Sequence, residues 1–307
     1  MFGAIDLGGT KIEACLFDQA LQAVSKKRIA TPHTSYEDLL DAIAEQCDWL
    51  MQRANDRRLP IGMGIPGLID RRTGLSTTAN LQAMNHPFQA DLSARLGRPM
   101  TVENDCKCFA LSEARGGAGD GYPVVFGLIL GTGVGGGVCR QGQLLGHHNG
   151  LSGEVGHIPL PAHLVAQLNL PILGCGCGRT GCYETLLSGP GMSRLCEHMT
   201  GVSRSAMGIV EGKLLGDTDL KDVFDCWLTL LCELLHTIEL VIDPDCIVLG
   251  GGLSRIDQLA AQLSAQFPQH QLPGLQAPQI RCARFGDSSG VRGAAMLAQQ
   301  FLINEGC

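Results

Sequence analysis

Three cysteines and one histidine have a spacing that could hold a metal ion. Cys175, Cys177 and Cys182 lie in the segment CGCGRTGC, and His157 precedes the first of them by eighteen residues. Three thiolates and one imidazole are a typical ligand set for tetrahedral Zn²⁺, and four protein ligands fill its coordination shell, as in structural sites. A disulfide among the three cysteines is the alternative, but their odd number and a reducing compartment argue against it. The motif therefore predicts a structural zinc site.

Two glycine-rich turns could each hold a phosphate group. The first, DLGGTK, follows a short strand-like segment, and its glycines allow successive backbone amides to face one anion. Lys11 would add a cation, and Asp6 could hold Mg²⁺ through water. An ordinary hairpin turn is the alternative interpretation. The candidate nucleotide-binding residues of this turn are Asp6, Gly8, Gly9, Thr10 and Lys11.

The second turn, GTGVGG, has the spacing of the dinucleotide-binding fingerprint G-x-G-x-x-G. That fingerprint requires a helix after the turn, whereas a second strand-like segment follows here, and the chain has no G-K-[ST] of a Walker-type loop. We therefore interpret it as a second phosphate-binding hairpin. Its candidate residues are Gly131, Thr132, Gly133, Val134, Gly135, Gly136 and Gly137. Gly251 and Gly252, after a later strand, are candidates for close approach to a nucleotide, with a plain strand-to-helix turn as the alternative.

A carboxylate that could accept a proton from a hydroxyl group follows the strand-like segment PMTVE. Phosphoryl transfer needs a phosphate cradle, a metal ion and such a base. Asp105 is the candidate, although Asn-Asp before a helix also describes a helix N-cap. Glu154, His157 and Glu184 lie around the cysteine motif and carry groups that can hydrogen-bond a small polar ligand. Each glutamate taken alone is more often a surface carboxylate.

The elements that must position these residues occur twice in the same order. We expect strands over 2–8, 11–17, 23–30, 61–65, 99–103, 124–131, 136–140, 246–250 and 279–284, and helices over 35–54, 106–115, 254–267 and from about 290. The repeated hairpin indicates an internal duplication and mixed sheets covered by helices. Ser254 and Asp257 form the S-x-x-D pattern of a helix cap. The loop 146–190 interrupts the alternation.

Length and charge limit the classes of function. The 307 residues are enough for two lobes, and the formal net charge of −7 without a run of Lys or Arg argues against nucleic acid or an anionic membrane as a partner. The N-terminal residues lack the features of a signal peptide, and no apolar run approaches the ~20 residues of a membrane span. We expect a cytoplasmic protein whose isolated cysteines, such as Cys15, Cys47, Cys226 and Cys246, are reduced core residues.

Six motifs that span nearly the whole chain resemble one family. DLGGTK, VENDCKCFALSEA, GLILGTGVGGGV, SGEVGHIPL, CGCGRTGCYE and VLGGGLS are similar to the motifs of the ROK family (repressor, open reading frame, kinase). The resemblance implies an α/β, two-lobed, actin-like and hexokinase-like ATPase fold with duplicated ribonuclease H-like lobes and a zinc-binding loop. It implies an N-terminal lobe over 1–120 and a C-terminal lobe over 121–307, whose last helix returns to the first lobe. ATP between the lobes and a homodimer are implied as well.

The resemblance also assigns roles to single residues. It makes Asp105 the general base, and it implies that the sugar contacts are Gly67, Asn80, Asn104, Asp105, Glu154, His157 and Glu184. The similarity within the family is to bacterial N-acetyl-D-glucosamine kinases, which implies ATP-dependent phosphorylation of that sugar at its 6-hydroxyl. Glucokinase and fructokinase remain alternatives. A sugar-responsive repressor is disfavoured, because Asp6 on the first strand leaves no room for an N-terminal DNA-binding region.

Overall fold

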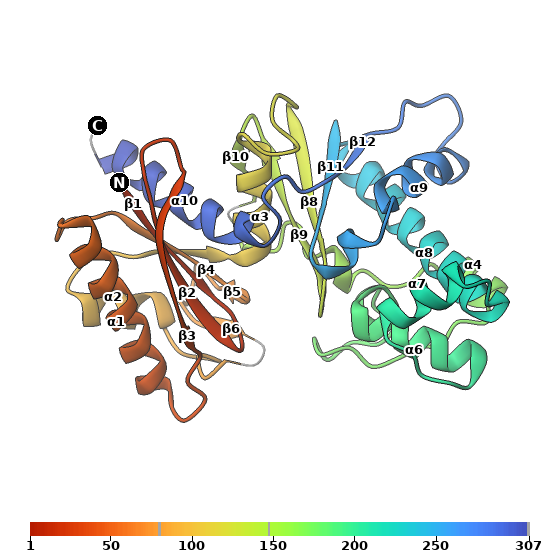
Figure 1. The fold of residues 1–307 in the computed structure, drawn as a ribbon, viewed down its shortest axis with the longest axis horizontal. Helices are drawn as coiled ribbons and strands as arrows, with labels where there is room; N and C mark the ends of the chain where they lie inside the picture. Colours follow the sequence, from red (N-terminus) through yellow and green to blue (C-terminus); the bar gives the residue numbers. More distant parts are fainter. Residues whose placement is uncertain (79–80, 147, 306–307) are drawn as a thin grey trace.

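Two five-stranded mixed sheets form the framework of the chain (Figure 1). The computed structural model describes residues 1–78, 81–146 and 148–305. The first sheet has the strand order β3-β2-β1-β4-β7 and the second has the order β10-β9-β8-β11-β12. In both, an antiparallel meander is extended by two parallel strands. The second sheet therefore repeats the pairing pattern of the first, in agreement with the predicted mixed sheets.

The elements have the following bounds. The first sheet contains β1 (Phe2–Leu7), β2 (Lys11–Phe17), β3 (Ala23–Ala30), β4 (Ile61–Ile65) and β7 (Thr101–Asn104), and a hairpin of β5 (Gly67–Ile69) and β6 (Ser76–Thr78) lies between β4 and β7 in the chain. The second sheet contains β8 (Val124–Leu130), β9 (Val134–Arg140), β10 (Gln143–Leu144), β11 (Cys246–Gly250) and β12 (Gln279–Cys282). The helices are α1 (Tyr36–Ala54), α2 (Phe88–Leu96), α3 (Asp105–Ala114), α4 (Ala162–Gln167), α5 (Glu184–Leu187), α6 (Gly189–Thr200), α7 (Ala206–Leu214), α8 (Thr218–Ile242), α9 (Leu259–Gln266) and α10 (Ser289–Glu305).

Helices α3 and α10 connect the two sheets (Figure 1). Helix α3 follows β7 of the first sheet but packs against β8 and β9 of the second, and α10 follows β12 of the second sheet but packs against β1 and β4 of the first. Residues 107–114 of α3 are all buried, as expected for a helix covered on every side. Gly137 of β9 allows this approach, because a Cβ there would lie 2.9 Å from the Cα of Lys107. The first residues of α3 therefore lie where the sheets meet.

One helix boundary differs from the prediction. The helix expected over 254–267 begins only at Leu259, after a 3₁₀ turn over Gly252–Arg255. The hydroxyl of Ser254 donates to the carbonyl of Gly251 instead of capping a helix, and Gln258 precedes α9 with φ 55°. The S-x-x-D prediction is therefore wrong, because the local turn satisfies the serine. None of the helices in the described ranges is both long and apolar enough to cross a membrane.

Candidate functional site

Two carboxylates lie on either side of strand β4 in the first sheet. Asp6 of β1 pairs in register with Gly64 of β4, which in turn pairs with Glu103 of β7, two residues before Asp105. A Cβ on Gly64 would lie 3.8 Å from Oδ1 of Asp6 and 3.7 Å from the Cα of Asp105. The two acids therefore both lie within van der Waals distance of a Cβ at this glycine, which places them close to each other.

Both acids are harder to ionise than an ordinary aspartate. Burial, followed by repulsion from Asp105, raises the pKa of Asp6 to about 7, and Lys11 and Arg28 offset this only in part. Burial also raises the pKa of Asp105, although the N–H of Cys106 donates to its Oδ1 over 2.8 Å. A close pair of half-buried carboxylates suits a cation or a proton-accepting role.

Asp6→Asn should stabilise the ligand-free protein at alkaline pH. Between its ordinary pKa of 3.8 and the raised value of about 7, Asp6 binds more protons in the folded than in the unfolded state. The free energy of unfolding contributed by this group therefore falls as the pH rises through that window. Asparagine cannot ionise, so the Tm of the variant should exceed that of the wild type by several degrees at about pH 8, and the difference should vanish at about pH 4. Calorimetric scans across this range test the sign, and a variant less stable than the wild type at pH 8 would contradict it.

Asn104, not Asp105, caps the helix. The side-chain oxygen of Asn104 accepts the N–H of Lys107 over 3.2 Å, and its Nδ2 donates to the carbonyl of Gly67 over 3.0 Å. Asp105 is the first residue of α3 and is half-buried. The capping role that competed with a chemical role for Asp105 is therefore filled by its neighbour. Gly67 has φ 131° and lies against the backbone of β6, while Asn80 falls outside the described residues.

Hydrogen bonds to Lys11 and Thr31 hold Gly8 of the first glycine turn in place. The N–H of Gly8 donates to the carbonyl of Lys11 over 2.9 Å, and the carbonyl of Gly8 accepts the hydroxyl of Thr31 over 2.7 Å. The N–H groups of Gly9 and Thr10 make no backbone hydrogen bond within the described ranges. The turn therefore presents two amides and the exposed Lys11 beside Asp6.

The second glycine turn is held by a glutamate from the cysteine loop. Oε2 of Glu184 accepts the N–H of Val134 over 2.9 Å, and a Cβ on Gly133 would lie 2.6 Å from the same oxygen. Of the first two residues of this turn, Thr132 is exposed and Gly131 is half-buried. Three of the predicted residues, Gly135, Gly136 and Gly137, are buried in β9, where they permit close packing against α3 and β8. Gly251 and Gly252 are exposed, and Gly251 borders this turn at Leu130.

The predicted metal ligands converge. One ligand atom each of His157, Cys175, Cys177 and Cys182 lies within 4.8 Å of all the others. Nδ1 of His157 is 3.5 Å from Sγ of Cys175, and the Sγ atoms of Cys177 and Cys182 are 3.8 Å apart, which is too far for a disulfide. Two isolated β-bridges, between residues 159 and 182 and between residues 174 and 180, fold the loop around this point. The donor set and its spread fit a tetrahedral ion.

Glu154 lies beside the predicted metal ligand His157. Oε2 of Glu154 is 3.9 Å from Nε2 of His157, the ring nitrogen not directed at Cys175. Burial raises the pKa of Glu154, and Asp105 and Glu184 raise it further by repulsion. Glu154 and the two carboxylates that repel it, Asp105 and Glu184, form an acidic group whose effect on the pKa of Glu154 is partly offset by His157 and Lys107.

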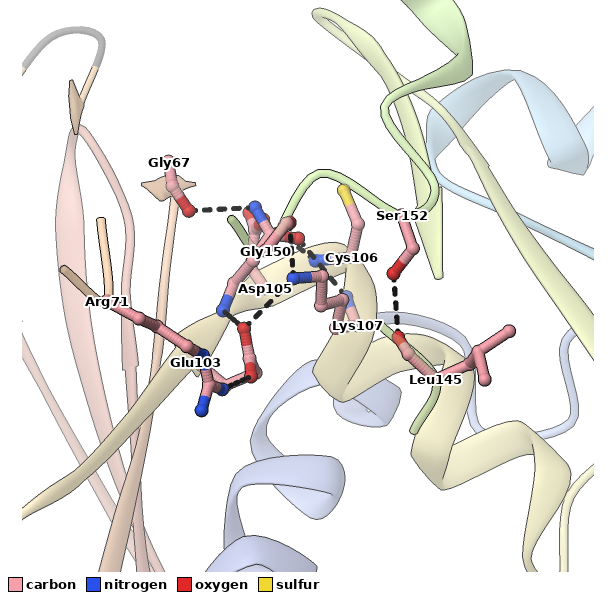
Figure 2. Close-up of polar contacts among 10 residues, drawn as sticks. Gly67, Arg71, Glu103, Asp105, Cys106, Lys107, Leu145, Gly150 and Ser152 are labelled. Atoms are coloured by element: carbon pink, nitrogen blue, oxygen red, sulfur yellow. Dashed lines mark hydrogen bonds and ion pairs between the residues drawn. The ribbon is translucent and has the colours of Figure 1, made fainter. Parts of the chain in front are cut away.

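The sequence analysis did not single out Glu103 and Lys107, which lie directly beside this group. Lys107 is buried and bonds both Glu103 and the carbonyl of Gly150 (Figure 2). The sequence feature that could have identified Lys107 is its position as a single lysine in the apolar segment CKCFAL. A cavity of about 890 Å³ borders the site at Asn104, Lys107 and Gly150 without including Asp105 or the glycine turns.

Known proteins match the chain over almost its full length. The model of the ROK family matches residues 2–301. An N-acetyl-D-glucosamine kinase of Salmonella typhimurium is 41% identical over 303 residues, which cover 97% of this chain and 99% of that protein. The structure of a ROK hexokinase from Thermus thermophilus has a TM-score of 0.87 and 30% identity, covering 99% of both chains. A ROK family glucokinase from Streptomyces griseus, in complex with glucose and AMPPNP, has a TM-score of 0.79 and 27% identity, covering 97% of this chain and 99% of that one.

Proposed function

The chain belongs to the ROK family, and we propose that it transfers the γ-phosphate of ATP to the 6-hydroxyl of N-acetyl-D-glucosamine. The observation that carries the substrate assignment is the 41% identity to an N-acetyl-D-glucosamine kinase over 97% of the chain. The paired carboxylates Asp6 and Asp105, between two glycine turns, support phosphoryl transfer as the reaction.

Asp105 accepts the proton of the attacked hydroxyl in this proposal. Its carboxylate is half-buried, and burial raises its pKa, which makes the ionised form a stronger base than an exposed aspartate. Asn104, Glu154, His157 and Glu184, with Gly67 and Asn80, would hydrogen-bond the other polar groups of the sugar. Several directional contacts of this kind hold a hydroxyl in line with a phosphate, which is the larger part of catalysis in phosphoryl transfer.

The glycine turns bind the nucleotide in this proposal. The exposed Lys11 and the amides of Gly9 and Thr10 face one side of the phosphates, and Gly131 to Val134 face the other, with Gly251 and Gly252 near the nucleoside. The close carboxylates of Asp6 and Asp105 fit a divalent cation, because a positive charge would relieve their repulsion. Asp6 would hold Mg²⁺, which supplies positive charge to the phosphate oxygens when bound.

Zn²⁺ bound by His157, Cys175, Cys177 and Cys182 would have a structural role. Four protein ligands leave no open coordination position. The ion would fix the loop from which Glu154 and Glu184 reach the site. We also propose a lobe boundary near residue 120 and a homodimer. The exposed apolar side chains of Leu214 and Leu215 at the C-terminal end of α7 are candidates for the dimer contact.

A sugar panel tests the substrate assignment. With ATP and Mg²⁺, kcat/KM for N-acetyl-D-glucosamine should exceed that for glucose by about 10-fold to 200-fold, the range that contact with one added methyl group can provide. A buried acetamide left without hydrogen bonds would cost about 1 to 3 kcal/mol, so its amide must also be paired. Glucose should therefore be a slow substrate rather than an excluded one. A preference for glucose, mannose or fructose in a coupled assay of ADP release would overturn the assignment.

A further inference from the structure

Lys107 carries a buried ammonium group at the point where α3 meets the loop after β10. Its side chain is 2% exposed, its Nζ donates to the carbonyl of Gly150 over 2.5 Å, and it lies 3.2 Å from Oε1 of Glu103. The second oxygen of Glu103 lies 3.3 Å from the guanidinium of Arg71. Figure 2 shows this chain of contacts running from the β5–β6 hairpin to the loop.

A buried ammonium is stable only where its donors are satisfied. An ammonium group has three donors, and removing it from water without partners is strongly destabilising. Glu103 offsets the charge, and Gly150 supplies the shorter of the two contacts. Because Gly150 belongs to the second-sheet side and Glu103 to β7 of the first sheet, the lysine fixes the distance between them.

The loop held by Lys107 leads directly to the polar residues of the site. Among the described residues, this loop is also attached to β9 and within itself. The N–H of Leu145 donates to the carbonyl of Val138 over 2.8 Å, and the hydroxyl of Ser152 donates to the carbonyl of Leu145 over 2.7 Å. The N–H of Glu154 donates to the carbonyl of Leu151 over 3.2 Å. Glu154 lies four residues after Gly150, so a displacement of Gly150 should also displace Glu154.

The same lysine lies two residues after Asp105 on the helix. Its backbone N–H binds the capping oxygen of Asn104 over 3.2 Å, so its backbone belongs to the first turn that orients Asp105. One residue thus connects the helix end that presents Asp105 to the loop that presents Glu154.

We infer that Lys107 is a positioning residue that sets the offset between Asp105 and residues 148–157 of the loop and thereby determines sugar affinity and turnover. The inference rests on the proposed function for its kinetic consequence, but not for the loop contact itself. Lys107 does not touch the sugar or the nucleotide in this scheme. It acts through Gly150, and the first glycine turn lies outside its contacts.

Lys107→Met tests this role, because methionine fills similar space without charge or donors. A misplacement of about 1 Å can cost about 100-fold in rate, so kcat/KM for the sugar should fall by roughly 10-fold to 100-fold while KM for ATP stays within about twofold. Hydrogen exchange of a peptide covering 145–157 should become faster. The matched control is Lys221→Met, which removes an exposed lysine paired with Asp225 and should change neither quantity.

A second variant separates positioning from charge balance. Lys107→Met leaves Glu103 without its buried partner, so its Tm should fall, and Lys107→Met/Glu103→Gln should recover most of that loss. The sugar defect and the fast exchange should persist in the double variant, because the contact to Gly150 is still missing. A normal sugar kcat/KM in Lys107→Met, or recovery of sugar kinetics in the double variant, would overturn the inference. If the wild type phosphorylated no sugar, the proposed function would fail, and unchanged exchange of 145–157 in Lys107→Met would still refute the loop contact on its own.

Discussion

Asp105→Asn should lower kcat by about 10²-fold to 10⁴-fold, the usual contribution of a general base. The amide oxygen of asparagine can still accept the N–H of Cys106, and Asn104 still caps α3, so the fold should be retained. Burial raises the pKa of Asp105 in the wild type, so replacing its charge should not reduce the Tm. The defect should therefore appear in turnover, with little change in KM for ATP.

The wild-type pH profile gives an independent check of the same base. The reaction needs ionised Asp105, and a raised pKa means that protonation begins at a higher pH than for an ordinary aspartate. As the pH is lowered, kcat should therefore begin to fall at a pH above the ordinary pKa of an aspartate. Asp225→Asn, at an exposed ion pair, is the control for the substitution itself. Near-normal turnover of Asp105→Asn would remove Asp105 from the mechanism.

Loss of one cysteine ligand should remove the metal and lower kcat/KM for the sugar. Purified protein should contain about one zinc per chain, and Cys177→Ser should lose most of it. Because Cys177 is exposed, its replacement should not disturb the packing of the core. Any loss of activity in the variant can therefore be attributed to loss of the metal ion. Structural zinc supplies about 10 kcal/mol or more in small peptides, but here two large cores remain, so the loop should loosen locally rather than the chain unfold. We expect sugar kcat/KM to fall by about 10-fold or more.

Cys282→Ser is the matched control, because Cys282 is also exposed but lies outside the cluster. It should retain full zinc content and activity. Metal analysis by mass spectrometry, together with sugar and ATP kinetics, decides the question. Zinc-free wild-type protein with full activity would contradict the metal site, and zinc-replete Cys177→Ser would contradict the ligand set.

The repeated hairpins and the metal ligands were predictable because their signals are local. Short apolar segments joined by glycine-rich turns identify β1–β2 and β8–β9. The spacing of Cys175, Cys177 and Cys182 brings thiolates together within one loop. The hairpin β5–β6 was missed because strands of three residues are too short to show a period. Helix α3 was placed one residue late because Asn104, rather than Asp105, serves as its cap.

Contacts between distant segments could not be predicted from the sequence. Glu184 was expected at a sugar, and the structure adds its bond to Val134, fifty residues away in the chain. Lys107 and Gly150 are forty-three residues apart, and nothing in either segment specifies the other. Such contacts depend on how α3 passes between the two sheets, which is a property of the whole fold. The roles of these residues therefore remain predictions that need the experiments above.

The most direct test of the proposed reaction is to identify its product. Purified protein, ATP, Mg²⁺ and N-acetyl-D-glucosamine should yield equal amounts of ADP and N-acetyl-D-glucosamine 6-phosphate, with the phosphate located at C6 by phosphorus–carbon coupling in the NMR spectrum. The same mixture with Asp105→Asn should yield the product at a rate lower by about 10²-fold or more. Phosphate on another carbon, release of free phosphate only, or no product from zinc-replete protein would contradict the proposed function.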